Sequence, residues 1–325
     1  MKTFRTILPA HRAPFDIAHT DRVLLIGSCF TEHICERLVE AKFPILTNPN
    51  GIVYNPVSIA RSLHALQQPD FDSKNDLFQQ QGLWHSWEHH SRFSHPDRDT
   101  AAEKITVAHR QAAAFLKTAN RLLITLGTAD VFVLRDTGQV VANNHKVPAN
   151  RFEQRRLSVV ETVDALAEAL LPLQAAMPDL RVVLTVSPVR HLRTGFVENQ
   201  RSKAVLVLAC AELCERFDFA HYFPAYELLL DDLRDYRFYA ADMIHPADTA
   251  VDYIWEQFSE TYFSRETQHL LERIAKISAA ARHRPFHPES PEHRAFARQQ
   301  LEQIGQLSAE HPHLDFEGEK SVFVF

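Results

Sequence analysis

The stretch RVLLIGSCFTEHICERLVEAK, residues 22–42, places a short apolar run ending in Gly27 directly before an amphipathic segment. The apolar run predicts a buried strand over 22–27, and the spacing of apolar residues after it predicts a helix over 31–42. The same alternation continues, with strands expected at 43–46, 121–127, 181–186 and 219–222 and helices at 56–66, 100–117, 159–176, 198–217, 226–233 and 246–263. This repeated alternation predicts an α/β fold with a doubly wound parallel sheet of about five strands.

Three regions depart from this alternation. Residues 77–95 are rich in histidine and aromatic residues, and Gln81-Gly82 predicts the turn of an inserted hairpin. A second hairpin is expected over 131–142, and two charged helices are expected over 267–282 and 292–307. The sequence therefore predicts one α/β domain over 1–263 and a helical C-terminal appendage over 264–325.

The composition is that of a packed globular protein, with 45% hydrophobic residues in a chain of 325. Its 35 basic and 41 acidic residues give a net charge of −6 without a basic block, so we expect no nucleic-acid partner. The sequence has no Gly-x-Gly-x-x-Gly fingerprint and no phosphate-binding loop, so we expect no cofactor. The oligomeric state does not follow from the composition.

The sequence carries no pattern typical of export or of a membrane segment. The first twenty residues lack a continuous apolar stretch, and no run of eighteen apolar residues occurs. Cys29, Cys35, Cys210 and Cys214 are few for this length and are expected to be reduced thiols. We therefore expect a cytoplasmic protein that does not contact a membrane.

Ser28 follows Gly27 at the expected strand-to-helix turn. At such a turn we expect the hydroxyl to be exposed and the N–H groups of the helix N-terminus to face a developing oxyanion. A serine in this place can attack a carbonyl carbon. The alternative is that Ser28 only caps the helix, which is a common use of serine.

Asp242-Met243-Ile244-His245-Pro246 lies after the last expected strand. The three-residue spacing lets the Asp242 carboxylate accept a hydrogen bond from His245 Nδ1, and Pro246 at the first position of a helix would fix the His245 backbone. Alternatively, His245 caps a helix and Asp242 is an unrelated surface residue. Because catalytic groups gather at the carboxyl ends of parallel strands, we expect Ser28, His245 and Asp242 to meet as a triad.

Several longer motifs occur in a fixed order: GSCF (27–30), NPNGIVYNP (48–56), HSWEHHSRFS (85–94), TLGTA (125–129), NHKVP (144–148), SPVRH (187–191), SK (202–203) and RDYRFY (234–239) before Asp242-x-x-His245-Pro246. In these motifs the chain resembles the GSCFA family of the SGNH (GDSL-like) hydrolase superfamily over residues 22–263.

The resemblance implies a three-layer, flavodoxin-like α/β/α sandwich in which Ser28, His245 and Asp242 are the triad. It also implies an oxyanion hole made of the Ser28 N–H, the Gly51 N–H and an asparagine after the third strand. This chain has Ala129 at the last position. Either the Thr128 hydroxyl donates there instead, or the hole has two donors. The superfamily further suggests a small acyl group, such as acetyl on a glycan.

The histidine-rich segment permits two interpretations. His85, Glu88, His89, His90 and His95 could form a metal site, or His85, His90 and Arg92 could bind a polar or anionic substrate. In strand periodicity His85 and His89 face one way and His90 the other, so no face gathers three histidines. We therefore favour substrate binding and expect no metal.

Further polar residues come from segments near the strand ends and are expected to line the mouth of the site: Asn144, His145, Lys146, Arg190, His191, Asn199 and Lys203. Each of them could instead form a surface ion pair or a cap. Together they suggest an oxygen-rich or negatively charged substrate.

The sequence thus predicts a serine-dependent acyl-ester hydrolase, an esterase or O-deacetylase, or an acyl transferase, acting on a small-molecule or glycan ester. Two alternatives stay open. One is a non-catalytic protein that binds a carbohydrate or an anion in the same crevice, and the other is a metal-dependent hydrolase built on residues 85–95.

Overall fold

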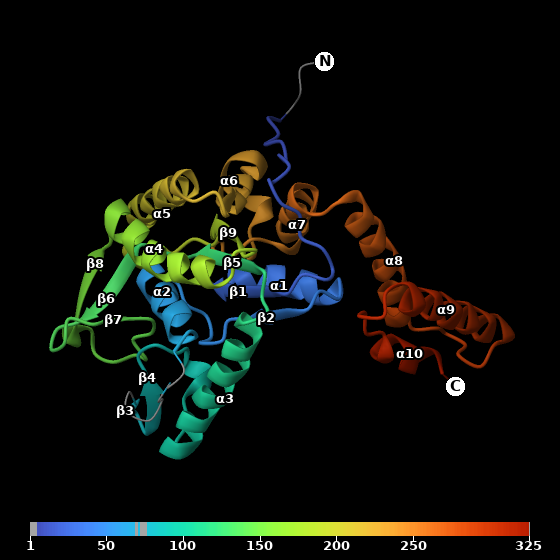
Figure 1. The fold of residues 1–325 in the computed structure, drawn as a ribbon, viewed down its shortest axis with the longest axis horizontal. Helices are drawn as coiled ribbons and strands as arrows, with labels where there is room; N and C mark the ends of the chain where they lie inside the picture. The colour runs from blue at the N-terminus through green and yellow to red at the C-terminus, as the bar shows by residue number, and fades with distance from the viewer. Residues whose placement is uncertain (1–4, 69–70, 72–76, 325) are drawn as a thin grey trace.

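A five-stranded parallel sheet forms the centre of the molecule, in the order β10-β9-β5-β1-β2 (Figure 1). The computed structural model describes residues 5–68, 71 and 77–324. The strands are β1 (Val23–Gly27), β2 (Ile45–Thr47), β5 (Arg121–Leu126), β9 (Arg181–Val186) and β10 (Ala220–Phe223), and all neighbouring pairs run parallel. The chain winds from β1 to β2 in one direction and from β5 to β10 in the other. The predicted α/β fold is therefore confirmed, with the reversal of winding between β1 and β5.

Helices cover both faces of the sheet and give three layers. Alternate residues of a strand point to opposite faces, so Leu24 and Ile26 pack in one apolar cluster and Val23 and Leu25 in the other. The first face carries α2 (Pro56–Ala65), α4 (Val159–Ala176) and α5 (Phe196–Arg216), and the second carries α1 (Phe30–Glu40) and α7 (Asp248–Tyr262). Burial on both faces explains why these strands are continuous apolar runs in the sequence.

Two small antiparallel sheets extend from the sandwich. The expected hairpin is present as β3 (Leu77–Gln80) and β4 (Leu83–Ser86), and α3 (Arg98–Leu116) follows it. The second expected hairpin, β6 (Asp130–Leu134) and β7 (Val140–Val141), gains a third strand, β8 (Phe152–Arg156), which the sequence analysis missed. The sequence of β8, FEQRR, has one buried apolar residue and therefore little strand pattern.

The C-terminal helices α8 (Arg265–Arg282), α9 (Pro291–Glu310) and α10 (Glu317–Phe323) lie to one side of the sheet (Figure 1). They enclose an apolar cluster of their own, which includes Ile274, Ile304 and Phe316. The segment reaches back to the loop after α1, where Lys42 Nζ lies 2.8 Å from Glu319. The two long helices agree with the prediction, and α10 is a further helix that the sequence analysis did not identify.

One expected helix begins later than predicted. Pro246 does not open α7, because it pairs with Tyr239 in an isolated β-bridge and Ala247 is the N-cap. The expected helix over 226–233 is present as α6 (Ala225–Glu227), which continues into a π-helix over Leu228–Leu233. None of the helices within the described ranges combines the length and the apolarity needed to cross a bilayer.

Candidate active site

Ser28 lies directly after β1, where the winding of the sheet reverses. The preceding Gly27 has φ 152°, and a Cβ there would lie 2.2 Å from the Thr125 carbonyl oxygen of β5. Only glycine allows this approach. On the other side, a Cβ added to Gly127 would lie 3.2 Å from Ser28 Cβ. Ser28 is consequently only 1% exposed, so the expectation of an exposed hydroxyl is wrong.

The Ser28 hydroxyl does not cap α1. The helix begins at Phe30 with Cys29 as its N-cap, and no side chain caps it. Ser28 Oγ is buried and has no hydrogen-bond partner among the described residues. A buried hydroxyl normally has a hydrogen-bond partner. A buried hydroxyl without one calls for an explanation, and a functional role is one such explanation. The capping alternative is therefore wrong.

Asp242 and His245 form the expected carboxylate–imidazole pair. His245 Nδ1 lies 2.6 Å from Asp242 Oδ2, and both side chains are a little under half exposed. Asp242 Oδ1 accepts the backbone N–H groups of Ile244 and His245 at 2.9 and 3.0 Å. These bonds, first that of the His245 N–H, lower the pKa of Asp242 to about 2. Asp242 is thus an ionised acceptor that fixes the orientation of the imidazole.

The backbone around this pair forms a short loop that several hydrogen bonds hold in place. Met243 has a left-handed φ of 58°, and the Ala240 N–H donates to the His245 carbonyl oxygen at 2.8 Å. The Arg190 N–H donates to the Ile244 carbonyl oxygen at 3.1 Å, and Arg190 Nη1 donates to that of Met243 at 3.2 Å. The Arg190 guanidinium also stacks over the Tyr239 ring at 3.9 Å. Arg190 therefore holds the loop that carries His245, in place of the free substrate contact expected from the sequence.

The strand order brings the two parts of the expected triad to one edge of the sheet. Ser28 follows β1, and Arg190, which holds the His245 loop, follows β9. Only β5 lies between these strands. The hydrogen bond between Ser28 Oγ and His245 is not formed in this structure, because Ser28 Oγ has no partner within the described chain. Catalytic hydrogen bonds often form only when substrate is bound.

The three groups expected as oxyanion donors are already hydrogen-bonded inside the protein. The Ser28 N–H donates to the Thr125 carbonyl oxygen at 3.1 Å, and the Gly51 N–H donates to that of Asn48 at 2.7 Å. The Thr128 hydroxyl is hydrogen-bonded to Ser202 Oγ at 3.0 Å. The oxyanion hole expected from the family pattern is therefore not preformed by these groups.

Three of the residues expected at the mouth of the site lie on or near α5. Their hydrogen bonds stabilise the loops at the carboxyl ends of β5 and β9 from the protein interior. Lys203 Nζ donates to the carbonyl oxygens of Gly127 and Ser187 at 2.8 and 2.6 Å. Asn199 Oδ1 accepts the backbone N–H of His191 at 2.8 Å. Lys203 is 1% exposed, and burial lowers its pKa to about 7. The prediction that Lys203 and Asn199 line the mouth is wrong, since both are buried supports of the loops after β5 and β9.

The expected substrate-binding histidines His85 and His145 are also buried, His85 in the inserted segment and His145 against it. His85 is hydrogen-bonded to Ser94 Oγ at 2.7 Å, and His145 Nε2 to the Ser86 carbonyl oxygen at 2.8 Å. Burial lowers the pKa of His145 to about 4. Their nitrogens are thus used to fold the insertion, and they do not face an open substrate site.

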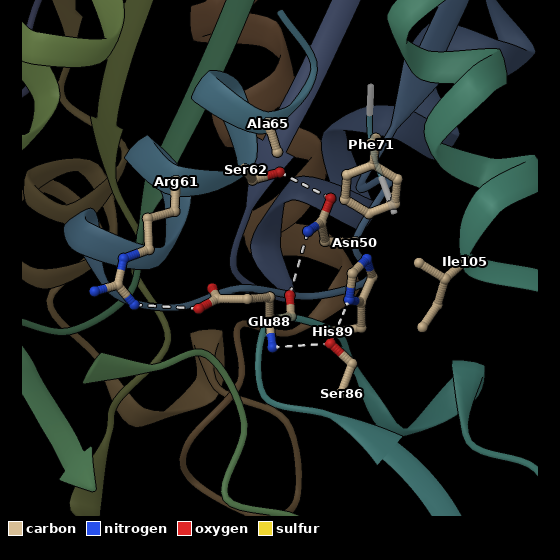
Figure 2. Close-up of a pocket in the computed structure, with 9 residues that line it drawn as sticks. All are labelled: Asn50, Arg61, Ser62, Ala65, Phe71, Ser86, Glu88, His89 and Ile105. Carbon is tan, nitrogen blue, oxygen red and sulfur yellow. Dashed lines mark hydrogen bonds and ion pairs between the residues drawn. The ribbon is translucent and has the colours of Figure 1, made fainter. Parts of the chain in front are cut away.

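The same segment forms one wall of a pocket of about 180 Å³ (Figure 2). His89 Nδ1 is hydrogen-bonded to Ser86 Oγ at 2.8 Å, and Asn50 Nδ2 donates to the Glu88 carbonyl oxygen at 3.2 Å. The lining residues are Asn50, Arg61, Ser62, Ala65, Phe71, Ser86, Glu88, His89 and Ile105. None of these is a member of the expected triad.

His90 and Arg92 close over the loop after β2. A Cβ added to Gly51 would lie 2.2 Å from His90 Cβ, so the two segments are in direct contact. Arg92 donates to the Asn48 carbonyl oxygen. Of the remaining expected residues, Asn144 Oδ1 accepts the Lys146 N–H at 3.3 Å. Lys146 itself is exposed.

The structure gives no support to the metal-dependent alternative. Across residues 5–68, 71 and 77–324, no three His, Cys, Asp or Glu side chains are grouped so that they could hold a metal ion. Sequence reasoning missed Asn48 and Ser202, which organise the loops around Ser28. Both lie in motifs that the resemblance contains, but residue type alone does not reveal their partners.

Family models match most of the chain. The model described as the GSCFA family covers residues 22–258, and the model described as the GSCFA domain protein, C-terminal domain, covers residues 274–323. No curated protein matches.

Solved structures show distant similarity. A protein from Streptococcus pneumonia provisionally described as a platelet activating factor is 12% identical, with TM-score 0.38, over 74% of this chain and 83% of the other. A carbohydrate esterase family 3 protein from Talaromyces cellulolyticus is 10% identical, with TM-score 0.36, over 78% and 99%. An acetyl xylan esterase (Est2A) from Butyrivibrio proteoclasticus is 10% identical, with TM-score 0.36, over 74% and 64%. These similarities are too distant to transfer an activity.

Proposed function

We propose that this chain, which belongs to the GSCFA family, is a serine-dependent acyl-ester hydrolase in which Ser28 is the nucleophile. The observation that carries the proposal is the Asp242–His245 pair at 2.6 Å, held at the same sheet edge as Ser28. An ionised carboxylate on Nδ1 leaves Nε2 as the basic nitrogen of the imidazole. Ser28 Oγ, which no internal group uses, supplies the matching nucleophile.

The reaction would proceed through an acyl-enzyme. Ser28 Oγ attacks the ester carbonyl carbon while its proton passes to His245 Nε2, and the carbonyl oxygen becomes an oxyanion. The intermediate collapses as the ester C–O bond breaks, and the leaving alcohol takes the proton from His245. A water molecule then attacks the acyl carbon with His245 as base, which releases the carboxylic acid and restores Ser28.

The enclosure of Ser28 favours a small acyl group. Ser28 is 1% exposed, and a Cβ added to the neighbouring Gly127 would lie 3.2 Å from Ser28 Cβ and 3.1 Å from the Tyr54 ring. A long acyl chain would require these neighbours to move, whereas acetyl needs little room. We propose an acetyl ester of a polar or carbohydrate alcohol as the substrate class.

A binding protein without turnover is the second candidate. It is favoured by the internal hydrogen bonds of the Ser28 N–H, the Gly51 N–H and the Thr128 hydroxyl. On this alternative the crevice holds a carbohydrate or an anion and no bond is broken.

Hydrolysis of p-nitrophenyl esters of increasing chain length separates the two candidates. We expect wild-type protein to cleave the acetate faster than the octanoate, and Ser28→Ala to abolish the reaction. Ser91→Ala, which changes an exposed serine, is the matched control and should cleave at the wild-type rate. Equal rates for wild type and Ser28→Ala would show that Ser28 is not the nucleophile.

A further inference from the structure

The loop after β2 carries a buried amide next to Ser28. Asn48 is 0% exposed, and its Oδ1 accepts the backbone N–H of Gly27 at 2.9 Å. Gly27 is the residue that precedes Ser28. The Asn48 side chain therefore lies against the strand-to-helix turn that presents the nucleophile.

The hydrogen bond to Gly27 determines which way the amide faces. A backbone N–H can only donate, so the amide oxygen must be the atom at Gly27, and Nδ2 is the free end. Nδ2 is buried and has no acceptor within the described residues. Ser28 Oγ and Thr31 Oγ1, on the turn beside it, are buried without partners as well. Unpartnered buried polar atoms are rare in native proteins, so their concentration here points to a functional role.

The backbone of Asn48 is firmly held. Its N–H donates to the Leu25 carbonyl oxygen at 2.8 Å, and its carbonyl oxygen accepts the Gly51 N–H at 2.7 Å and a bond from Arg92. Its φ of 45° lies in the left-handed region, which Asn tolerates better than most residues. A donor fixed in this way needs no rearrangement when charge develops near it.

Two other side-chain donors near Ser28, Lys203 Nζ and the Thr128 hydroxyl, are already hydrogen-bonded. Lys203 Nζ is bonded to the carbonyl oxygens of Gly127 and Ser187. The Thr128 hydroxyl is shared with Ser202 and the Asp130 N–H. Asn48 Nδ2 is thus a side-chain donor at this turn whose N–H groups have no acceptor among the described residues.

We propose that Asn48 Nδ2 donates a hydrogen bond to the oxyanion that forms when Ser28 attacks an ester. This inference rests on the proposed function. The superfamily pattern places an amide donor after the third strand of the central sheet, which is β5 here, and this chain has Ala129 at that position. The inference assigns the amide donor to the loop after β2 instead.

Asn48→Asp tests the donor with little change in shape. Its carboxylate can still accept the Gly27 N–H, and Asp also tolerates a left-handed φ, but an ionised carboxylate cannot donate. Between pH 7 and 9 we expect kcat for p-nitrophenyl acetate to fall by about 10²–10³-fold with KM nearly unchanged. Asn150→Asp makes the same charge change at an exposed asparagine and should keep kcat within about threefold of wild type. Thermal unfolding of all three proteins checks that they fold.

The outcomes distinguish the inference from the proposed function. Wild-type hydrolysis that Ser28→Ala does not abolish overturns both. Hydrolysis that depends on Ser28 but is retained in Asn48→Asp overturns the role of Asn48 alone. If Asn48→Asp does not fold, a crystal structure of wild-type protein phosphonylated on Ser28 decides. The phosphonyl oxygen is expected about 2.7–3.1 Å from Asn48 Nδ2, and an oxygen bonded only to other donors contradicts the inference.

Discussion

The chemistry at the residue scale depends on which polar atoms are already bonded. One carboxylate oxygen of Asp242 accepts two backbone N–H groups, and the other is hydrogen-bonded to His245 Nδ1. The first oxygen fixes the loop and the second fixes the ring. Ser28 Oγ, in contrast, has no partner in the described part of the chain. In the proposed mechanism, Asp242 therefore orients His245, and Ser28 Oγ is the group that reacts.

Asp242→Asn separates these two roles. The amide oxygen can still accept the N–H groups of Ile244 and His245, whereas its NH₂ group faces His245 Nδ1 and forces the proton onto Nε2. That tautomer cannot accept the Ser28 proton, so we expect kcat for ester hydrolysis to fall about 10³–10⁴-fold. Asp248→Asn, in the first turn of α7, is the control. A kcat within threefold of wild type would show that Asp242 does not act through His245.

The buried Lys203 makes a separate prediction about stability. Burial lowers its pKa to about 7 from the ordinary 10.5, so between these pH values unfolding takes up a proton. The contribution of this group to the free energy of unfolding therefore rises as pH increases from 7. We expect urea unfolding at pH 7, 8 and 9 to show the wild type gaining stability relative to Lys203→Met. Parallel pH curves for the two proteins would contradict this.

The triad candidates and the Asp242–His245 pair could be predicted from the sequence, but the hydrogen-bond partners of the residues around them could not. Ser28 and Asp242-x-x-His245 are marked by short motifs at expected strand ends. The burial of Lys203 goes against the usual exposure of lysine, and the hydrogen bonds from Nζ to the carbonyl oxygens of Gly127 and Ser187 account for it. Such acceptors come from neighbouring strands, so local sequence does not indicate them.

At the scale of elements, the loops at the carboxyl edge of the sheet hold one another in place. The loop after β9 holds the His245 loop through Arg190, and α5 holds the loops after β5 and β9 through Ser202, Lys203 and Asn199. His245 is therefore positioned by contacts between elements, and not by a helix that starts at Pro246.

Arg190→Ala is expected to loosen this loop while leaving the triad residues present. It removes the bond to the Met243 carbonyl oxygen and the stack on Tyr239, and keeps the backbone bond to Ile244. Because small misplacements of a catalytic base are costly, we expect kcat to fall about 10- to 100-fold. Arg193→Ala, an exposed residue of the same segment that stacks on Phe132, serves as the control. An unchanged kcat in steady-state assays would remove Arg190 from the positioning network.

The main elements were predictable because their patterns are strong. Strands buried on both faces are continuous apolar runs, and Asn55-Pro56 marks the start of α2, where Asn55 Oδ1 accepts the Ser58 N–H at 2.9 Å. The strand β8 and the start of α7 were not predictable. The strand β8 depends on pairing with β6, and the bridge between Tyr239 and Pro246 delays α7.

At the scale of the whole molecule, the sandwich and the C-terminal helices have separate apolar cores. Phe316 lies in the core of α8–α10 at 1% exposure, and its ring lies 4.7 Å from Lys42 Nζ, which follows α1. The domain division proposed at residue 263 implies that the two cores can be perturbed independently.

Phe316→Ala tests this division. Removing a buried aromatic ring costs about 3–5 kcal/mol, and we expect the loss to be confined to α8–α10. Hydrogen exchange should show reduced protection over 265–323 and unchanged protection in the strands of the central sheet, with esterase kcat preserved. Parallel loss of protection in both regions would show that they form one cooperative unit.

Labelling with a fluorophosphonate probe shows, without knowledge of the substrate, whether Ser28 is an activated nucleophile. The measurement is mass-spectrometric mapping of the adduct in wild-type and His245→Ala protein. We predict an adduct on Ser28 that forms in wild-type protein and is lost in His245→Ala. No adduct on folded wild-type protein, or labelling at the same rate in both proteins, would show that His245 does not activate Ser28.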